Sequence, residues 1–297
     1  MSGKDAAATI RTGRPPWLRV RLPHGETYFR LKHLLRDRNL HTVCESAACP
    51  NIGECWGRGT ATLMILGNVC TRSCGFCDVI TGKPTGTDWR EPYRVAETVK
   101  TMGLKYAVIT SVDRDDLEDG GARIWATTIR EIKKRNPDCP VEALIGDFKG
   151  SAESLQTVLD AQPDVLAHNT ETVPRLYPTV RPQAKYPRAL ELLDRARRRG
   201  FTTKTSLILG LGETTDELFE VFRDLRAIDC QILTLGQYLQ PTRNHLPVER
   251  FVPPEEFDAL ARKARSLGFR YVASGPLVRS SYLAETHYQG MLAALSG

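Results

Sequence analysis

The chain has no apolar run near the roughly 18–20 residues that a membrane-spanning helix needs. Its amino-terminal stretch, MSGKDAAATIRTGRPPW, is polar and lacks the apolar segment of a secretory signal. No homeodomain, zinc-finger or RNA-recognition pattern accompanies the net charge of +6. We therefore expect a cytoplasmic protein with no membrane association and no nucleic-acid partner.

Internal repeats and low-complexity tracts are also absent, and much of the net positive charge lies in two places. One is the first forty residues, and the other is the run Arg195, Arg197, Arg198 and Arg199. Such a run is typical of a solvated helix face. The alternative is a patch for an acidic protein or a phosphate.

Cysteine is distributed unevenly, because six of the eight cysteines fall between positions 44 and 77. A disulfide framework is typical of short secreted chains, whereas this chain has 297 residues. The pattern favours metal binding in a reducing compartment.

From residue 61 onward, short apolar segments alternate with helical patterns. The expected strands are Thr62–Leu66, Tyr106–Thr110, Val141–Ile145, Val165–Ala167, Thr203–Leu209 and Ile232–Leu235. The expected helices are Tyr93–Met102, Ala122–Arg135, Ala152–Ala161, Pro187–Arg199, Thr215–Ile228 and Pro254–Leu267. Strands that are apolar throughout indicate a parallel sheet covered by helices. We predict an α/β fold, a partial (β/α)6 barrel, because six units are two short of a closed eightfold barrel.

The barrel is expected over residues 61–270, between an N-terminal extension (1–60) and a C-terminal tail (271–297). One helix is predicted in the extension at Thr27–Asp37, and a short strand in the tail at Tyr271–Ala273. Ser151 and Thr214 are predicted to cap the helices that follow them.

The first cysteine motif, Cys70-Thr-Arg-Ser-Cys74-Gly-Phe-Cys77, follows the first expected strand. In such folds the chemistry lies at the carboxyl ends of the strands. Three thiolates on a four-iron cluster leave one iron open. Structural zinc is the alternative, but it normally uses paired C-x2-C knuckles with four ligands, and no second knuckle is near. The motif therefore predicts an iron–sulfur cluster with an open iron.

This C-x3-C-x2-C spacing resembles the signature of the radical S-adenosylmethionine (radical SAM) superfamily. The resemblance implies that the open iron chelates the amino and carboxyl groups of the methionine moiety of S-adenosylmethionine (SAM). One-electron reduction then yields a 5′-deoxyadenosyl radical. The resemblance also implies that Phe76 lies beside the adenine, the alternative being a plain core aromatic.

A second motif, formed by Cys44, Cys49 and Cys55, lies upstream with a C-x4-C-x5-C spacing. Pro50 and Gly53 shape turns between these thiols. Buried structural thiols or a zinc loop are the alternatives. We interpret the motif as a second cluster with three thiolates, whose fourth ligand comes from elsewhere in the chain.

Two such motifs side by side resemble the lipoyl synthase family, and the resemblance covers nearly the whole chain. The similar segments are residues 42–56 and then TSVDRDDL (110–117), DGGA (119–122), HNTETV (168–173), VRP (180–182), LGLGET (209–214), YLQPT (238–242), HLPV (245–248) and RSSY (279–282). The resemblance implies two [4Fe-4S] clusters. It also implies that a serine of the last segment is the missing ligand: Ser280, with Ser281 as its rival.

The strand-end rule and the resemblance select the same residues for SAM. Asn169 and Glu171 follow the fourth strand and are expected to bond the ribose hydroxyls and the methionine amine. Arg181 is expected to bind the carboxylate as a planar bidentate donor. Thr110 ends the second strand and contributes a hydroxyl. The glycines of residues 210–213 let the backbone approach the adenosyl group, although their usual meaning is a strand-to-helix turn.

Two further features have open interpretations. The charged residues 113–116 are either a self-paired loop or a gate or carrier contact over the site. His245 is expected to be structural, because radical chemistry needs no general base there.

The resemblance implies that two sulfur atoms are inserted at C6 and C8 of an octanoyl chain amide-linked to a lysine of a carrier protein. That carrier is an H protein or the lipoyl domain of a dehydrogenase-complex E2. Two SAM molecules are consumed and the second cluster supplies the sulfur. A reductant such as ferredoxin or flavodoxin and a cluster-repair carrier are the other expected partners.

The sequence is compatible with two rival functions. One is another radical enzyme, a methylthiotransferase or a biotin-synthase-like sulfur inserter. The other is a non-catalytic iron–sulfur or zinc module.

Overall fold

The computed structural model describes residues 14–18, 25–47, 49–58 and 60–296. We predict the absence of a secretory signal from the polar N-terminal stretch. Residues 1–13 of that stretch lie outside the described residues. Among the described residues, no helix is both long and apolar enough to cross a membrane.

One large sheet forms the centre of the molecule, with the strand order β1-β2-β5-β6-β7-β8-β9-β10. Its strands are β1 (His41–Thr42), β2 (Thr62–Ile65), β5 (Ala107–Ser111), β6 (Val141–Leu144), β7 (Val165–Ala167), β8 (Thr202–Leu209), β9 (Ile232–Gln237) and β10 (Tyr271–Ser274). From β2 to β10 every neighbouring pair is parallel, and only β1 is antiparallel to its neighbour β2. The strands β3 (Val69–Cys70) and β4 (Ile80–Thr81) form a separate parallel pair.

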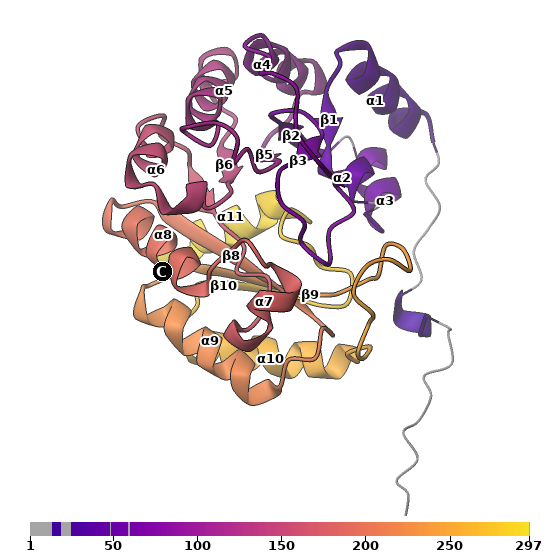
Figure 1. The fold of residues 1–297 in the computed structure, drawn as a ribbon, viewed down its shortest axis with the longest axis vertical. Coiled ribbons are helices and arrows are strands. Elements are labelled where there is room, and N and C mark those ends of the chain that lie inside the picture. Colours follow the sequence, from indigo (N-terminus) through magenta and orange to yellow (C-terminus); the bar gives the residue numbers. More distant parts are fainter. Residues whose placement is uncertain (1–13, 19–24, 48, 59, 297) are drawn as a thin grey trace, which may run out of the picture.

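Six helices follow one another around the outside of the strands, as Figure 1 shows: α4 (Glu91–Met102), α5 (Ala122–Arg135), α6 (Ala152–Leu159), α8 (Tyr186–Arg198), α9 (Thr215–Ala227) and α10 (Pro254–Ser266). The remaining helices are η1 (Pro16–Leu18), α1 (Glu26–Asp37), α2 (Val43–Ser46), α3 (Ile52–Gly57), η2 (Phe148–Gly150), η3 (Pro174–Leu176), α7 (Tyr177–Val180) and α11 (Ala284–Ser296). The six predicted strands and helices all form in the predicted order, which confirms the α/β fold with a mostly parallel sheet.

The local signals predicted from the sequence also form. The Ser151 side chain accepts a hydrogen bond from Ser154 N at the start of α6. Thr214 and Glu217 make a reciprocal capping box at the start of α9. The predicted helix at Thr27–Asp37 is α1, one residue longer at its start.

The C-terminal part differs from a simple tail. β10 continues the parallel sheet beyond β9, and α11 packs against β10. α11 also reaches the start of β5, because Tyr288 packs against Tyr106, the residue just before this strand, with ring centroids 5.4 Å apart. Its buried positions Ala284, His287 and Met291 follow a helical spacing, but the stripe contains a histidine and so lacks a plain apolar signature.

Three of the four arginines in the run at the end of α8 are paired with acidic neighbours. Arg195 bonds Glu191 and Arg198 bonds Asp194, each one helical turn earlier. Arg197 bonds Asp229 at 2.8 Å. These contacts favour a solvated helix face over a partner patch.

A buried ion pair crosses the sheet between β6 and β8. Lys204 Nζ donates to both carboxylate oxygens of Glu142, at 2.8 and 2.9 Å, and both side chains are almost unexposed. Tyr106 also donates to this carboxylate, at 2.9 Å. Glu142 is therefore compensated by two donors inside the barrel.

Lys204→Met is expected to lower the free energy of unfolding by about 3–5 kcal/mol, because it leaves a buried carboxylate unpaired. Urea unfolding of the apoprotein measures the loss. Replacing both residues, as K204M with E142L, should recover most of it, since no lone charge then remains. A double variant no more stable than K204M would contradict this explanation.

Candidate functional site

The first cysteine motif forms a loop between β3 and β4, at the carboxyl ends of the barrel strands. Gly82 N bonds Cys70 O at 2.9 Å, which closes the loop. Gly75 N donates to Val180 O, and Leu246 N donates to Gly75 O. A Cβ on Gly75 would lie 2.8 Å from the Leu246 side chain, so the motif's glycine permits this contact.

His245 fixes the end of the same loop. Its Nε2 lies 3.1 Å from Cys77 O, and its Nδ1 lies 2.9 Å from Thr242 Oγ1. These contacts agree with the predicted structural role.

The three thiols of this loop lie in a desolvated environment. Burial raises the pKa of Cys74 to about 11 and that of Cys77 to about 12. Burial also raises the pKa of Cys70. Neighbouring thiols reinforce the shifts of Cys74 and Cys77. Such thiols lose their protons when they bind a metal.

Asn169, Glu171 and Arg181 form a polar group beside this loop. Asn169 Nδ2 donates to Glu171 Oε1 at 3.0 Å, and Arg181 Nη1 donates to Asn169 O at 2.6 Å. Glu171 has φ 63, a conformation unusual for a residue other than glycine and often found at functional sites. The carboxylate of Glu171 raises the pKa of Cys74 and Cys77, and the Arg181 guanidinium acts in the opposite direction on Cys74.

Two buried polar atoms of this group have no partner among the described residues: Asn169 Oδ1 and Arg181 Nε. Buried polar atoms are normally satisfied, so unpaired ones indicate where a ligand bonds. A free donor and a free acceptor beside three thiols suit an amino-acid ligand such as the methionine moiety of SAM.

The other predicted contacts have more ordinary surroundings. Phe76 packs against a small apolar cluster that includes Val180, Leu211 and Tyr238. Thr110 Oγ1 donates to Leu144 O at 3.2 Å. The Glu213 carboxylate accepts hydrogen bonds from Gly210 N and Leu211 N, so residues 210–213 form a self-capped turn between β8 and α9.

The upstream cysteines lie on two short helices of the N-terminal extension. Cys44 is in α2, Cys55 is in α3, and Cys49 lies between them, with its N–H bonded to Cys44 O at 3.0 Å. Burial raises the pKa of Cys44 to about 11 and that of Cys55 to about 12, and burial also raises the pKa of Cys49. All three line a cavity of about 500 Å³.

The Arg-Ser-Ser-Tyr segment lies against these helices, far away in sequence. Asn51 Nδ2 donates to Leu277 O at 2.7 Å, and Tyr282 OH donates to Glu54 Oε1 at 3.1 Å. Ser281 is among the residues that line the cavity. Ser280 occupies the same turn between β10 and α11 and is half-buried.

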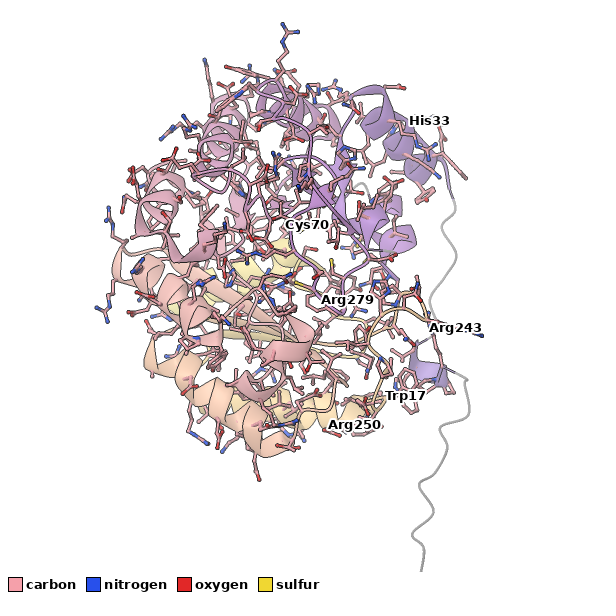
Figure 2. All side chains as sticks on the ribbon, viewed as in Figure 1. Trp17, His33, Cys70, Arg243, Arg250 and Arg279 are labelled. Carbon is pink, nitrogen blue, oxygen red and sulfur yellow. The ribbon has the colours of Figure 1, made fainter. Side chains whose placement is uncertain are left out.

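Two residues that were given no role of their own from the sequence lie in or against this segment. Arg279 is half-buried and lies near both Cys49 and Glu171; burial lowers its pKa, and these two acidic groups oppose the shift. Figure 2 shows Arg279 and Cys70 in the middle of the molecule. Gly236 in β9 allows the backbone at Val278 to approach the strand closely, because a Cβ at position 236 would lie 2.0 Å from Val278 O. A glycine inside a strand pattern is the one sequence signal of such an approach.

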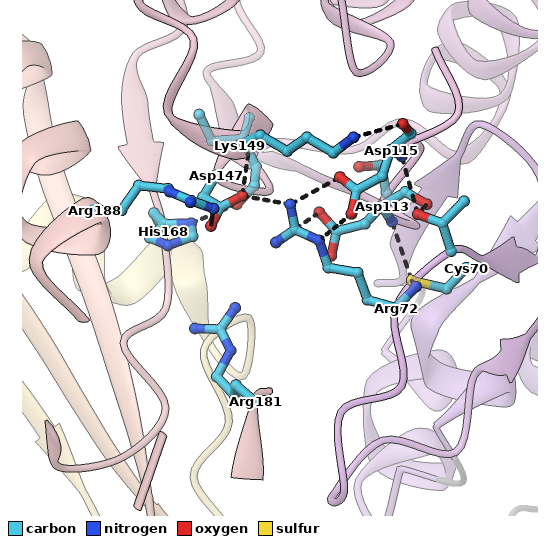
Figure 3. Close-up of polar contacts among 12 residues, drawn as sticks. Cys70, Arg72, Asp113, Asp115, Asp147, Lys149, His168, Arg181 and Arg188 are labelled. Atoms are coloured by element: carbon cyan, nitrogen blue, oxygen red, sulfur yellow. Dashed lines mark hydrogen bonds and ion pairs between the residues drawn. The ribbon is translucent and has the colours of Figure 1, made fainter. Parts of the chain in front are cut away.

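The charged residues 113–116 are ion-paired, partly within the segment and partly with the first cysteine loop. Arg114 binds its neighbour Asp116 through two hydrogen bonds of 2.8 Å. Asp113 and Asp115 instead face Arg72 of the cysteine loop (Figure 3). The cluster therefore ties the loop after β5 to the first cysteine motif.

Within the described part of the chain, no group of three or more His, Cys, Asp or Glu side chains is arranged to hold a metal ion. Whether these residues fit a cofactor is therefore judged from the chemistry of the side chains that could bind it. Two separate trios of thiols, a cavity beside one trio and unpaired polar atoms beside the other fit iron–sulfur clusters and SAM.

Solved structures of low sequence identity share the fold. HydG, a maturase of the [FeFe]-hydrogenase, has a TM-score of 0.55 at 13% identity, covering 91% of this chain and 75% of that one. Streptococcus suis SuiB bound to precursor peptide SuiA has a TM-score of 0.57 at 9% identity, covering 83% and 52%.

Sequence comparison is more specific. Residues 64–225 match the family model of the Radical SAM superfamily, and residues 4–49 match the N-terminal domain of lipoyl synthase of the Radical SAM family. Lipoyl synthase of Methylococcus capsulatus is 58% identical, covering 92% of this chain and 85% of the relative. That of Rubrobacter xylanophilus is 57% identical, covering 92% and 86%, and the mitochondrial enzyme of Nematostella vectensis is 51% identical, covering 93% and 96%. These matches span nearly the whole chain, which therefore belongs to the lipoyl synthase family of radical SAM enzymes.

Proposed function

We propose that this radical SAM sulfurtransferase inserts two sulfur atoms, at C6 and C8, into an octanoyl chain carried on a lysine of a lipoyl carrier protein. The observation that carries the proposal is the pairing of two thiol trios with two different surroundings. Cys70, Cys74 and Cys77 adjoin the unpaired atoms of Asn169 and Arg181. The other trio adjoins a cavity and the serine-bearing turn.

We assign two [4Fe-4S] clusters to these trios. The first is held by Cys70, Cys74 and Cys77, and the second by Cys44, Cys49, Cys55 and Ser280. In this assignment the extension 1–60 holds the thiolates of the second cluster, the barrel 61–270 holds the first cluster, and the tail 271–297 supplies the serine.

When bound, the first cluster and SAM supply a radical that can abstract hydrogen from unactivated carbon, and the second cluster supplies sulfur. The protein's own residues do the positioning. Arg181 offers Nε to the methionine carboxylate, and Asn169 with Glu171 offers oxygens to the amine and the ribose. Phe76 provides an apolar face for the adenine, and the fifth SAM contact is the hydroxyl of Thr110. Burial of these groups keeps water from the reacting atoms.

The partners follow from this chemistry. The acyl chain is delivered by an H protein or the lipoyl domain of an E2 subunit. Electrons come from a small carrier such as ferredoxin or flavodoxin, and the spent second cluster is rebuilt by a cluster-repair carrier. We place the reaction in the cytoplasm.

The serine ligand has its own test. Ser280→Ala removes a proposed direct ligand, so it is expected to lower product formation by more than the roughly 10–100-fold typical of outer-shell changes, while SAM cleavage remains. Ser281→Ala is the matched comparison, since Ser281 is among the residues that line the cavity and is the neighbour of Ser280 on the same turn. The signal of the second cluster, read by Mössbauer spectroscopy, should change in S280A alone. A change confined to S281A would transfer the assignment to Ser281.

Anaerobic turnover with an octanoyl-lysine peptide tests the function as a whole. We expect the peptide mass to gain two sulfurs, with about eight irons per chain in the reconstituted protein, four for each cluster. An unchanged peptide alongside SAM cleavage would refute the substrate. About one zinc per chain without cleavage would support a structural metal module instead.

A further inference from the structure

Arg72 lies inside the first cysteine motif, yet its side chain points away from Cys70 Sγ into a cage of carboxylates (Figure 3). The side chain is only 2% exposed. Nε and Nη2 donate to the two oxygens of Asp115 at 2.8 and 2.9 Å, and Nη2 also donates to Asp147 at 2.6 Å. Asp113 lies 3.8 Å from Nη1. A buried guanidinium with a bidentate partner holds its position firmly.

The cage joins three segments of the barrel top. Asp113 and Asp115 follow β5, Asp147 follows β6, and Arg72 belongs to the cysteine loop. Outer cations complete it, because Arg188 Nη1 binds Asp147 Oδ2 at 3.1 Å and Lys149 Nζ donates to Asp115 O at 2.8 Å.

The packing of the cage leaves little freedom at its centre. A Cβ on Gly146 would lie 2.3 Å from Asp113 Oδ1, so the absence of a side chain at Gly146 lets this carboxylate take its place. A rigid arrangement of this kind suits a positioning role.

The same segments hold the sulfur of Cys70. Two backbone N–H groups point at Cys70 Sγ: that of Asp113 at 3.3 Å and that of Arg72 at 3.5 Å. Thr71 secures this junction, since its N and Oγ1 both donate to Asp113 O, at 3.0 and 2.9 Å. Both donors to the sulfur therefore belong to segments that the carboxylate cage clamps together.

Hydrogen bonds to cluster sulfurs are among the factors that set reduction potentials. They stabilise the reduced cluster more, because it carries one more negative charge. We propose that Arg72 is a positioning residue: its ion pairs with Asp115 and Asp147 hold the two N–H donors on Cys70 Sγ and thereby raise the reduction potential of the first cluster. This inference rests on the proposed function in taking Cys70, Cys74 and Cys77 as cluster ligands.

The test is a potentiometric titration with redox mediators, monitored by electron paramagnetic resonance. The protein carries alanine at Cys44, Cys49 and Cys55, so that only the first cluster gives a signal. In Arg72→Gln the ratio of reduced to oxidised cluster at a fixed potential should fall about tenfold. This corresponds to a decrease of about 59 mV in the reduction potential of a one-electron couple. Arg72→Lys should show a smaller shift in the same direction, because lysine keeps the charge but not the planar fork.

Asp115→Ala separates positioning from simple charge. Removing a negative charge would by itself raise the potential, whereas loss of the clamp lowers it. We expect the potential to fall. A potential that rises or does not move in D115A would overturn the inference. If Arg72→Gln fails to bind iron, R72K and D115A decide the question by the same criterion.

Arg114→Gln is the matched control. Its guanidinium is equally buried and ion-paired, but its described contacts are with Asp116, Leu66 O and Gly86 O. It should leave the potential unchanged, and an equal shift in R114Q and R72Q would refute a specific role for Arg72. Failure of the parent protein to bind four irons would instead count against the proposed function.

Discussion

Cys49→Ala is expected to abolish sulfur insertion and leave reductive cleavage of SAM largely intact. Cys49 lines the cavity with Cys44 and Cys55, whereas the first trio lies on a different loop between β3 and β4. Loss of a direct ligand should exceed the 10–100-fold effect typical of outer-shell changes, so product should fall by more than about 100-fold. Chromatography of 5′-deoxyadenosine and mass spectrometry of the octanoyl peptide measure the two activities separately.

Two other cysteines provide the comparison. Cys74→Ala should lose both activities, because it removes a ligand of the first cluster. Cys139→Ala should keep both, since this buried thiol lies in the turn before β6 and contacts Pro140 O. Loss of both activities in a folded C49A that still binds about four irons would mean that the two trios do not act separately.

The fold could be predicted from the sequence because its signals are local. The strands β2, β6 and β7 are buried along nearly their whole length, and each is followed by a helix with a clear cap or apolar stripe. Such patterns depend on neighbouring residues alone. α11 is the counterexample: His287, the fourth residue of this helix, is buried, and its ring packs on Tyr271 with centroids 5.1 Å apart.

The candidate ligands were also identifiable, because cysteine spacing and strand ends are sequence features. The residues that surround these ligands could not be identified from the sequence, because their contacts join segments that are distant in the chain. Arg72 looks like an ordinary polar residue of its motif, but it meets Asp147, 75 residues away. Arg279 reaches the surroundings of both Cys49 and Glu171 only once β10 returns the chain to the sheet. The sequence therefore predicts candidate ligands for the cofactors, and the structure adds the long-range contacts around these candidates.

Arg181→Met is expected to weaken SAM binding by about 100-fold, because truncating one member of a buried, hydrogen-bonded charge pair costs about 2–5 kcal/mol. In the described structure Arg181 is 8% exposed and its Nε has no partner, while Nη1 is committed to Asn169 O. A carboxylate at Nε would complete its hydrogen bonding. Equilibrium dialysis of SAM against the reconstituted protein gives the Kd directly.

Arg181→Lys separates charge from geometry at this position. Lysine retains the charge but donates from a single point, so it should recover only part of the affinity. Arg175→Met is the control, because this neighbouring arginine forms an exposed pair with Glu217 and should leave SAM binding unchanged. Iron content must stay equal among the three proteins, since Arg181 also lies near Cys74. Equal SAM affinity in R181M and the parent would mean that Arg181 holds the Asn169 backbone and not the methionine carboxylate.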